Sequence, residues 1–364
     1  MKNKADKLTK KLLIIITILL CSIGVGYTVY KIDLNKKIAE EARILAEENR
    51  INALKPSKDV YICLNEEIEF SNVSRFDEKI ISLSQNGDKY IIKGLKVGFT
   101  DVYDETTDSK TRIYVSDLFD LPHIDNNKTP VPCHAYSTEQ AHYLDRVLAY
   151  KINEAGYQTR AGVVAAARFL SMQFKYRILY FYENGRLNNG TGHPYADGEG
   201  RYYHKGLYLS DDKYADVVAS DNGQGIWGCE IYETGEERMY PNGIDCSGFV
   251  SWALLNGGFD PDDIGGGNGY NTKDYTLLSL GKNVLLTELD FSQLKAGDFI
   301  EFPGHIGMII GIDGDTIHIV QAFWDNDLEV ITFTKDDLIK SEWEAVILMD
   351  EYYKSDGNYT TMWK

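Results

Sequence analysis

The hydrophobic pattern opens with one long uncharged run. LLIIITILLCSIGVGYTVY, residues 12–30, follows directly after the lysine-rich MKNKADKLTKK. As a helix, 19 residues extend about 28 Å, close to the ~30 Å hydrocarbon core of a bilayer. We therefore expect residues 1–30 to form a cytoplasmic tail and a transmembrane anchor, with the rest of the chain outside, because flanking lysines stay in the cytoplasm. A cleaved signal peptide is the alternative, but no small-x-small cleavage site follows the run.

The next stretches change character twice. Residues 31–56 are rich in Ala, Glu and Lys, with a weak helical repeat that ends near Pro56, and they predict a helical stalk. Residues 57–118 contain EEIEF, KIISLSQ, KYIIKGL and KTRIYV, short β-branched and aromatic segments separated by turn signals. That alternation predicts a small antiparallel β domain. Residues 119–135, with Pro and Asn, predict a linker.

Residues 136–352 combine helices with a later sheet. A Ser137–Gln140 capping box begins a helix that Gly156 ends, and AGVVAAARFLSMQF predicts a buried helix after it. DFIEF, HIGMIIGI, TIHIVQAF, LEVITF and EAVILMD predict strands, and the short turns DGD and DND make neighbours antiparallel. Helices followed by a sheet predict an α+β domain. A polar insertion at about 185–242 interrupts it, and 353–364 form a tail.

Charge and cysteine content narrow the function. The net charge is -17 and the pI about 4.9, with no basic stripe beyond the N-terminus, which argues against nucleic acid as a partner. Of five cysteines, Cys21 lies in the apolar run and the others are far apart, so no disulfide framework is evident.

One cysteine has a distinctive context. In NGIDCSGFVSWALLNGG, Cys246 begins a short apolar helix that ends at Gly257. Unpaired N–H groups and a partial positive charge at a helix start favour the thiolate, so we expect the thiol pKa to lie below its usual value of about 8.5. The same N–H groups are suited to stabilise an oxyanion during acyl transfer.

A thiolate nucleophile needs a partner that accepts a proton, which is usually His. His305 begins the strand HIGMIIGI, and alternation places Gly307 and Gly311 on its face. We expect the opposite face to join the core and the glycine face to leave room for a helix and a substrate. On the next strand, His318 and Gln321 are candidates to orient the imidazole, and they point to opposite faces.

Metal and cofactor chemistry is not indicated. A zinc site from Cys229, Cys246, His305 and His318 lacks any closely spaced ligand pair. We therefore expect no metal and no cofactor. Asp298 in AGDF is interpreted as a turn residue rather than a catalytic acid.

Three motifs in order resemble the NlpC-type cell-wall peptidases, a papain-like family: DCSGFVSWAL, then LKAGDFIEF, then HIGMIIG. The resemblance spans roughly residues 135–350. It implies a papain-like fold and hydrolysis of peptidoglycan stem peptides without a cofactor, with Cys246 attacking the carbonyl and His305 carrying the proton. Gln321-Ala322 matches the family's polar residue followed by Ala, which favours Gln321 as the third catalytic residue. Many members use His there, so His318 stays open.

The resemblance also implies substrate contacts. ILYFYENG places Tyr180 at the position of a pocket tyrosine, and Asp245 and Ser247 flank the nucleophile where relatives bind substrate. Separately, residues 77–103 resemble the end of a bacterial immunoglobulin-like domain, which implies a β-sandwich used as spacer or adhesin.

Together these expectations describe a single-pass membrane protein with a cysteine peptidase domain on the cell-wall side and peptidoglycan peptide as its partner. Two alternatives stay open. One is an amidase or acyltransferase with the same Cys–His pair, and the other is a non-catalytic wall-binding or assembly protein that uses its Tyr- and Gly-rich insertion. The oligomeric state is not predicted.

Overall fold

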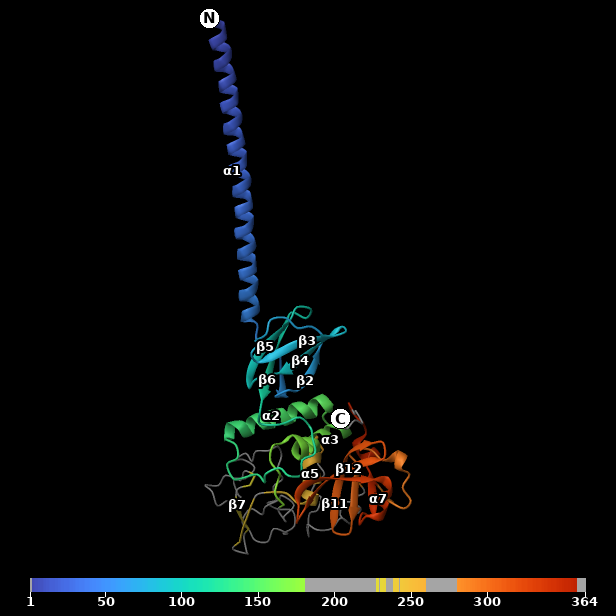
Figure 1. Ribbon diagram of the computed structural model, residues 1–364. Helices are drawn as coiled ribbons and strands as arrows, with labels where there is room; N and C mark the ends of the chain where they lie inside the picture. The colour runs from blue at the N-terminus through green and yellow to red at the C-terminus, as the bar shows by residue number, and fades with distance from the viewer. Residues whose placement is uncertain are drawn as a thin grey trace.

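The computed structural model describes residues 2–180, 227–228, 230–233, 238–241, 243–259 and 280–358. The predicted insertion at 185–242 lies almost entirely outside these residues. Figure 1 shows three parts along the molecule: a long N-terminal helix, a small β domain at its end, and an α+β domain beyond it.

The N-terminal helix α1 runs without a break over Lys2–Ala53, so it joins the apolar run to the predicted stalk. Within the described residues, this is one helix long and apolar enough to cross a membrane. Its last turn is fixed to the β domain. Ile51 is buried there, and the Arg50 guanidinium donates to both carboxylate oxygens of Asp108, at 2.8 and 2.9 Å.

In the described part of the chain the β domain contains two three-stranded sheets, ordered β1-β6-β5 and β2-β4-β3. Val60 and Ile113 from the first sheet pack against Ile81 and Ile92 from the second. The strands are β1 (Lys58–Cys63), β2 (Glu67–Phe70), β3 (Ile81–Asn86), β4 (Lys89–Gly94), β5 (Gly98–Asp104) and β6 (Ser109–Ser116).

The prediction of a purely antiparallel β domain is wrong at one pair, because β1 runs parallel to β6. Between these two strands the chain passes through the other sheet and returns, and such a long connection permits parallel pairing. KDVYIC, residues 58–63 inside the predicted β domain, forms β1, a strand that is not among the segments named from the sequence.

The β domain shares its core with the α+β domain. Tyr61 on β1 stacks on Tyr114, with ring centroids 5.1 Å apart. Tyr143 and Tyr150 from helix α2 (Thr138–Ala155) pack edge-on against Tyr61, at 5.5 and 5.7 Å. These contacts hold the β domain against α2 directly, in addition to the linker.

The α+β class is confirmed, and the helices form as the pattern predicts. The Ser137–Gln140 capping box begins α2, and the predicted apolar face of this helix is buried: Ala141, Leu144, Val147, Leu148 and Ile152. The buried helix α3 (Arg160–Arg168) continues into a π-helical turn over Phe169–Gln173. The third helix is α5 (Cys246–Asn256).

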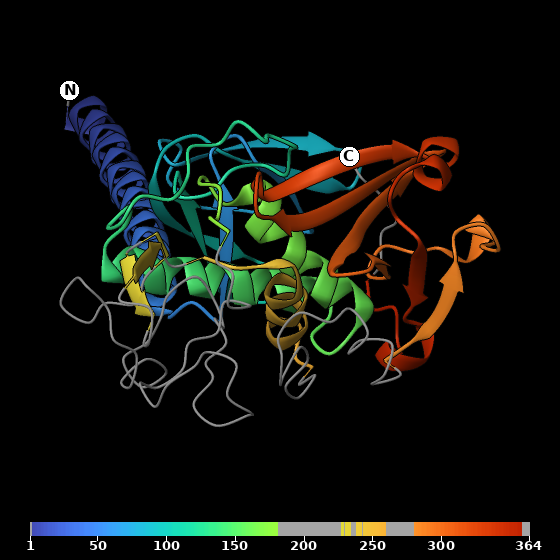
Figure 2. The ribbon, with the colours of Figure 1, turned by 90° about the horizontal axis from the view of Figure 1, so that it is seen from below.

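Six antiparallel strands form the sheet of this domain among the described residues, in the order β13-β12-β11-β10-β14-β9. Figure 2 shows these strands to one side of the helices. The strands are β9 (Lys282–Leu285), β10 (Phe299–Phe302), β11 (His305–Asp313), β12 (Thr316–Phe323), β13 (Asp327–Thr334) and β14 (Ala345–Leu348), and the smaller elements are the β7–β8 hairpin (Glu230–Glu233 and Arg238–Pro241), the 3-10 turn Phe291–Gln293, α7 (Lys335–Lys340) and α8 (Asp350–Tyr353).

Both faces of β11 are buried, so the expectation that the face of His305 leaves room for a helix and a substrate is wrong. Helix α5 packs on the face of Ile306 and Met308, not on the face that His305 shares with Gly307. A register shift between Ile309 and Gly311 places Gly311 opposite His318, so Gly311 does not share the face of Gly307 as alternation predicted. On the face of Gly307, a Cβ added to this residue would lie 2.9 Å from a methyl of Ile319 and 3.2 Å from the Trp343 ring. The space that Gly307 leaves is therefore filled by a second hydrophobic core.

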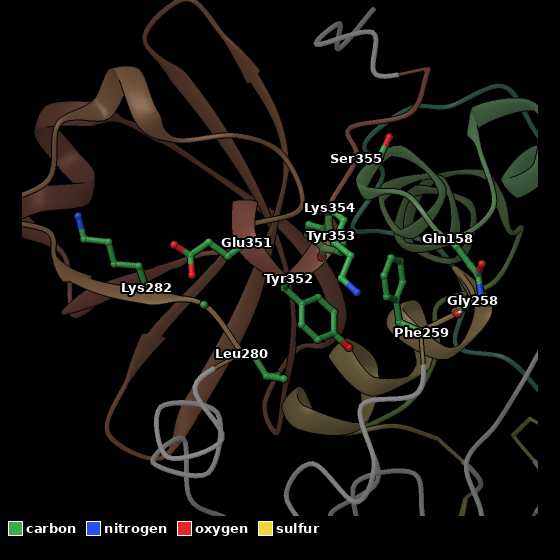
Figure 3. A pocket seen from close by; sticks show the side chains of 11 residues that line it. Gln158, Gly258, Phe259, Leu280, Lys282, Glu351, Tyr352, Tyr353, Lys354 and Ser355 are labelled. Carbon is green, nitrogen blue, oxygen red and sulfur yellow. Dashed lines mark hydrogen bonds between the residues drawn. The ribbon is translucent and has the colours of Figure 1, made fainter.

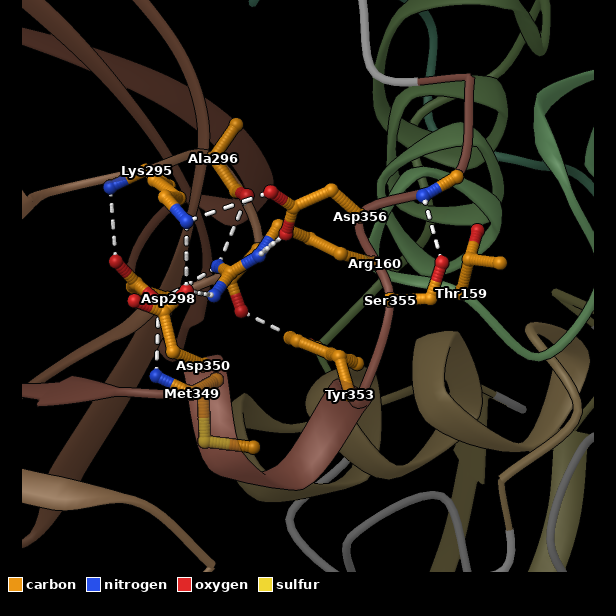
Figure 4. A network of polar contacts seen from close by, with 12 residues as sticks. Thr159, Arg160, Lys295, Ala296, Asp298, Met349, Asp350, Tyr353, Ser355 and Asp356 are labelled. Carbon is orange, nitrogen blue, oxygen red and sulfur yellow. Dashed lines mark hydrogen bonds and ion pairs between the residues drawn. The ribbon is translucent and has the colours of Figure 1, made fainter.

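A buried arginine ties α3 to the sheet and to the chain after it (Figure 4). Arg160 is fully buried and pairs with Asp298 at 2.7 Å, with Asp350 at 2.6 Å and with Asp356 at 3.1 Å. Gly297, at φ +95°, has no room for a side chain, because a Cβ there would lie 2.8 Å from Arg160 Cγ. Asp298 is thus a buried ion-pair partner, more than the turn residue that the sequence indicated.

We predict that Arg160→Met lowers the free energy of unfolding by about 3–5 kcal/mol, because the buried Asp298 carboxylate loses its counter-charge. Urea unfolding of the full-length chain in detergent micelles, followed by tryptophan fluorescence, measures the change. Lys335→Met is the matched control. It removes an exposed pair with Asp315 at 3.1 Å, which should contribute at most about 1 kcal/mol. Equal losses for both variants would contradict the assignment of the Arg160 network as a major support.

Candidate active site

The start of α5 fixes Cys246. Asp245 is the N-cap residue, and its Oδ1 accepts a hydrogen bond from the Gly248 N–H at 2.8 Å. The preceding residue, Ile244, forms a parallel bridge with Tyr180, and its N–H donates to the Leu179 carbonyl at 2.9 Å. The cysteine is therefore held between a capped helix and a short backbone pairing.

A tight turn positions His305. Phe302 at the end of β10 pairs with His305 at the start of β11, and only Pro303 and Gly304 connect them. Gly304 has a φ of +93°, and a glycine with positive φ after a proline suits a type II turn. The imidazole consequently lies at the end of the sheet rather than in its middle.

A chain of hydrogen bonds orients the imidazole. His305 Nε2 lies 2.8 Å from Gln321 Oε1, and Gln321 Nε2 donates to Glu329 Oε1 at 2.8 Å. The Glu329 carboxylate only accepts, so the amide NH₂ of Gln321 faces it and the amide oxygen faces His305. Nε2 of a neutral His305 then carries the proton, which leaves Nδ1 as its acceptor nitrogen.

Glu329 was missed in the sequence. A signal existed, because Glu329 pairs directly with Gln321 between β12 and β13. Cross-strand partners share a face of the sheet, so the DND turn could have suggested this neighbour. Asn326 reinforces the carboxylate by donating to the same Oε1 at 3.1 Å.

Aromatic rings enclose His305. The ring centroids of Phe302 and Phe323 lie 5.0 Å from the imidazole, and that of Trp343 lies 5.3 Å away. His305 is only 3% exposed. Burial lowers its pKa to about 4, against a smaller opposing effect of the hydrogen bond to Gln321. The imidazole is therefore neutral at physiological pH.

The expected low pKa of the Cys246 thiol is wrong in direction. Burial, and after it the negative charge of Asp245, raise this pKa to about 12, although the residue as a whole is only half-buried. Backbone N–H groups of Ile306, Ser247 and Cys246 itself act in the opposite direction, as a helix start should, but their effect is smaller. The thiol is thus neutral at rest.

The hydrogen bond from the Ile306 N–H also indicates where Cys246 lies relative to His305. Ile306, whose N–H reaches the thiol, directly follows His305 on β11. The thiol and the imidazole therefore lie at the same end of β11, with α5 packed on the Ile306 face and the imidazole on the other. This end of β11 thus carries a neutral thiol, an imidazole and helix-start N–H groups.

His318 is placed elsewhere. It lies opposite Gly311, and its Nδ1 is 3.1 Å from Thr332 Oγ1. It faces away from the side that carries Gln321, as alternation along β12 predicts. Of the two candidates for the third residue, the structure therefore brings Gln321 to His305.

The three residues expected to contact substrate, Tyr180, Asp245 and Ser247, lie near Cys246 but differ in burial. Tyr180 is half-buried, and its N–H donates to Asp327 Oδ1 at 2.9 Å, so it lies between the Cys246 segment and the β12–β13 turn. Asp245 and Ser247 are buried, at 1% and 6% exposure, and their side chains lie 3.4 Å apart. This burial favours a structural role for both.

Other features lie apart from this site. A cavity of about 960 Å³ lies at the far end of α5 from Cys246, beside Phe259 and Tyr352 (Figure 3). Cys133 is disulfide-bonded, whereas Cys63 and Cys246 are free thiols. Among the residues that the structure describes, no group of three His, Cys, Asp or Glu side chains could hold a metal ion.

Comparison with known proteins gives no independent identification. The interpretation of the site therefore rests on its own geometry: a thiol, an oriented imidazole and nearby backbone donors. No protein-family model matches the chain, and no curated protein matches its sequence.

Proposed function

We propose that this protein is a membrane-anchored cysteine peptidase of the papain-like NlpC type, which hydrolyses the stem peptides of peptidoglycan. One observation carries the proposal: Gln321 and Glu329 orient His305 at the strand end where the Cys246 thiol lies. A nucleophile, a base and a group that orients the base are the parts that covalent acyl transfer requires.

The neutral resting state determines how the first step proceeds. With a thiol pKa near 12 and an imidazole pKa near 4, a preformed thiolate–imidazolium pair is a minor species. His305 Nδ1 instead takes the thiol proton as Sγ attacks the peptide carbonyl carbon. Backbone N–H groups at the start of α5 stabilise the resulting oxyanion.

The remaining steps return both groups to their starting state. The imidazolium gives its proton to the leaving amine, the C–N bond breaks, and an acyl-thioester forms on Cys246. A water molecule then attacks the thioester while His305 accepts its proton. The C–S bond breaks, the sulfur regains a proton from His305, and the products are a carboxylic acid and an amine.

The other parts of the chain suit an exported enzyme. The α1 helix anchors it in the membrane, with the lysine-rich end in the cytoplasm and the catalytic domain on the cell-wall side. The Cys133 disulfide favours an oxidising compartment. The two packed sheets of residues 58–116 serve as a bacterial immunoglobulin-like spacer between the anchor and the enzyme.

We predict that Cys246→Ala and His305→Ala each reduce peptidoglycan hydrolysis at least ~10²-fold, because each removes a reacting group. The assay incubates the full-length chain in detergent micelles with purified peptidoglycan and identifies the products by mass spectrometry. Circular dichroism checks that the variants fold. Full activity in Cys246→Ala would end the Cys–His mechanism, and no hydrolysis by the unaltered chain would favour a wall-binding protein. Release of intact stem peptides from the sugar would identify an amidase.

The two candidates for the third residue give a second comparison. Gln321→Ala should lower kcat by about tenfold or more, because the imidazole loses the partner that holds its orientation. His318→Ala, on the opposite face, should change kcat by less than about twofold. A larger loss in His318→Ala than in Gln321→Ala would reverse the assignment.

The pH dependence of kcat/KM should follow the lowered pKa of His305. His305 must be neutral to act as the base, and its pKa is lowered from 6.5 to about 4. The protonated, inactive form therefore appears only below about pH 4, and kcat/KM should hold through pH 5–6 rather than fall near 6.5. Circular dichroism at each pH separates this effect from acid unfolding. A fall in kcat/KM centred at 6.5 with the fold intact would show that the imidazole is hydrated in the working enzyme.

A further inference from the structure

The turn between β12 and β13 presents an exposed indole beside the candidate active site. Trp324 is 69% exposed, although Ala322 two residues earlier is fully buried. A single exposed apolar side chain needs no special explanation. This indole, however, lies on a constrained turn close to His305.

The turn is held from several sides. Phe323 packs on His305, and Asn326 donates to Glu329, the residue that ends the hydrogen-bond chain. Asp327, at φ +60°, accepts from the Tyr180 N–H and pairs with Arg177 at 3.1 Å. The indole is thus displayed on a fixed support, and a preorganised binding group loses little entropy when a ligand arrives.

The indole is also close to the reacting groups. The Phe323 ring centroid lies 5.0 Å from the imidazole of His305 and 6.3 Å from the ring of Trp324. An extended peptide advances about 3.4 Å per residue. A substrate whose scissile bond lies beside the His305 imidazole would therefore reach Trp324 within about three residues of that bond.

The chemistry of the turn matches a sugar ring. The indole offers a broad apolar face with a negative quadrupole, which suits the C–H face of a pyranose. Beside it, exposed Asp325 and Asn326 can accept and donate hydrogen bonds at the hydroxyl and acetamido rim of a sugar. Asp325 makes no hydrogen bond or ion pair within the described chain, so its carboxylate is available and disfavours an anionic ligand.

We propose that Trp324 stacks against a sugar of the glycan strand, with Asp325 and Asn326 bound to the rim of that sugar. The enzyme then acts on stem peptides that are still attached to glycan, and it cleaves within about three residues of the sugar. This inference rests on the proposed function, since it names the part of the same substrate that lies beyond the scissile bond.

Binding to peptide-free glycan strands tests the proposal without hydrolysis. The full-length Cys246→Ala protein in detergent micelles is titrated with these strands by isothermal calorimetry. Adding Trp324→Ala should weaken binding about tenfold, whereas Trp324→Tyr, which keeps an aromatic face, should retain most of it. Tyr352→Ala is the matched control, because it removes an aromatic ring from the cavity at the far end of α5 and should leave the affinity unchanged.

Three results would overturn the proposal: no binding by the Cys246→Ala protein, unchanged binding after Trp324→Ala, or loss of binding in Tyr352→Ala instead. Kinetics add a second readout. In the chain that retains Cys246, Trp324→Ala should lower kcat/KM for glycan-linked peptide about tenfold relative to sugar-free stem peptide. Failure of the proposed function is distinguishable, because it would abolish Cys246-dependent cleavage of both substrates while glycan binding through Trp324 persisted.

Discussion

Burial of strand β11 on both faces is the constraint on which the candidate site depends. Helix α5 packs on the side of Ile306 and Met308, and the second hydrophobic core, which contains Trp343, fills the side of Gly307. A helix and an imidazole on opposite faces of one strand meet only at its end. The Pro303-Gly304 turn places His305 at that end, and the Asp245 cap begins the helix beside it. The tight packing of the two cores thus places the candidate site at the end of β11.

The same packing sets the protonation of the site. Aromatic rings exclude water from His305, and burial of the thiol outweighs the N–H groups of the helix start. A low local dielectric disfavours both charged forms, so the resting pair is neutral. In the proposed mechanism, charge would develop on such a pair only when a substrate carbonyl arrives, where the backbone donors can stabilise it. The Glu329 carboxylate acts at a distance by fixing the Gln321 amide.

The parts of the chain outside the site are connected to it by packing as well as by sequence. Tyr61 on the β domain packs among aromatic residues of α2, and Arg50 holds the end of α1 to Asp108. Arg160 in turn joins α3 to the sheet through Asp298. These contacts favour a stiff support for the α+β domain, in which the N-terminal helix, the β domain and the sheet are held together at successive points.

The sequence by itself determined the local structure. Periodicity and end signals identified α2, α5 and the strands from β10 to β14, because capping boxes, glycine stops and short turns act over a few residues. Alternation also separated Gln321 from His318 by face. The tertiary structure decided what depends on residues distant in the chain: the face of β11 on which α5 packs, the parallel pairing of β1 with β6, the burial that raises the Cys246 pKa, and the partnership of Gln321 with Glu329. Solvent exclusion and long-range packing are properties of the assembled core, so no local pattern specifies them. The DND turn carried a partial signal for the Gln321–Glu329 pair, but the hydrogen bond by which Glu329 holds the Gln321 amide depends on the assembled sheet.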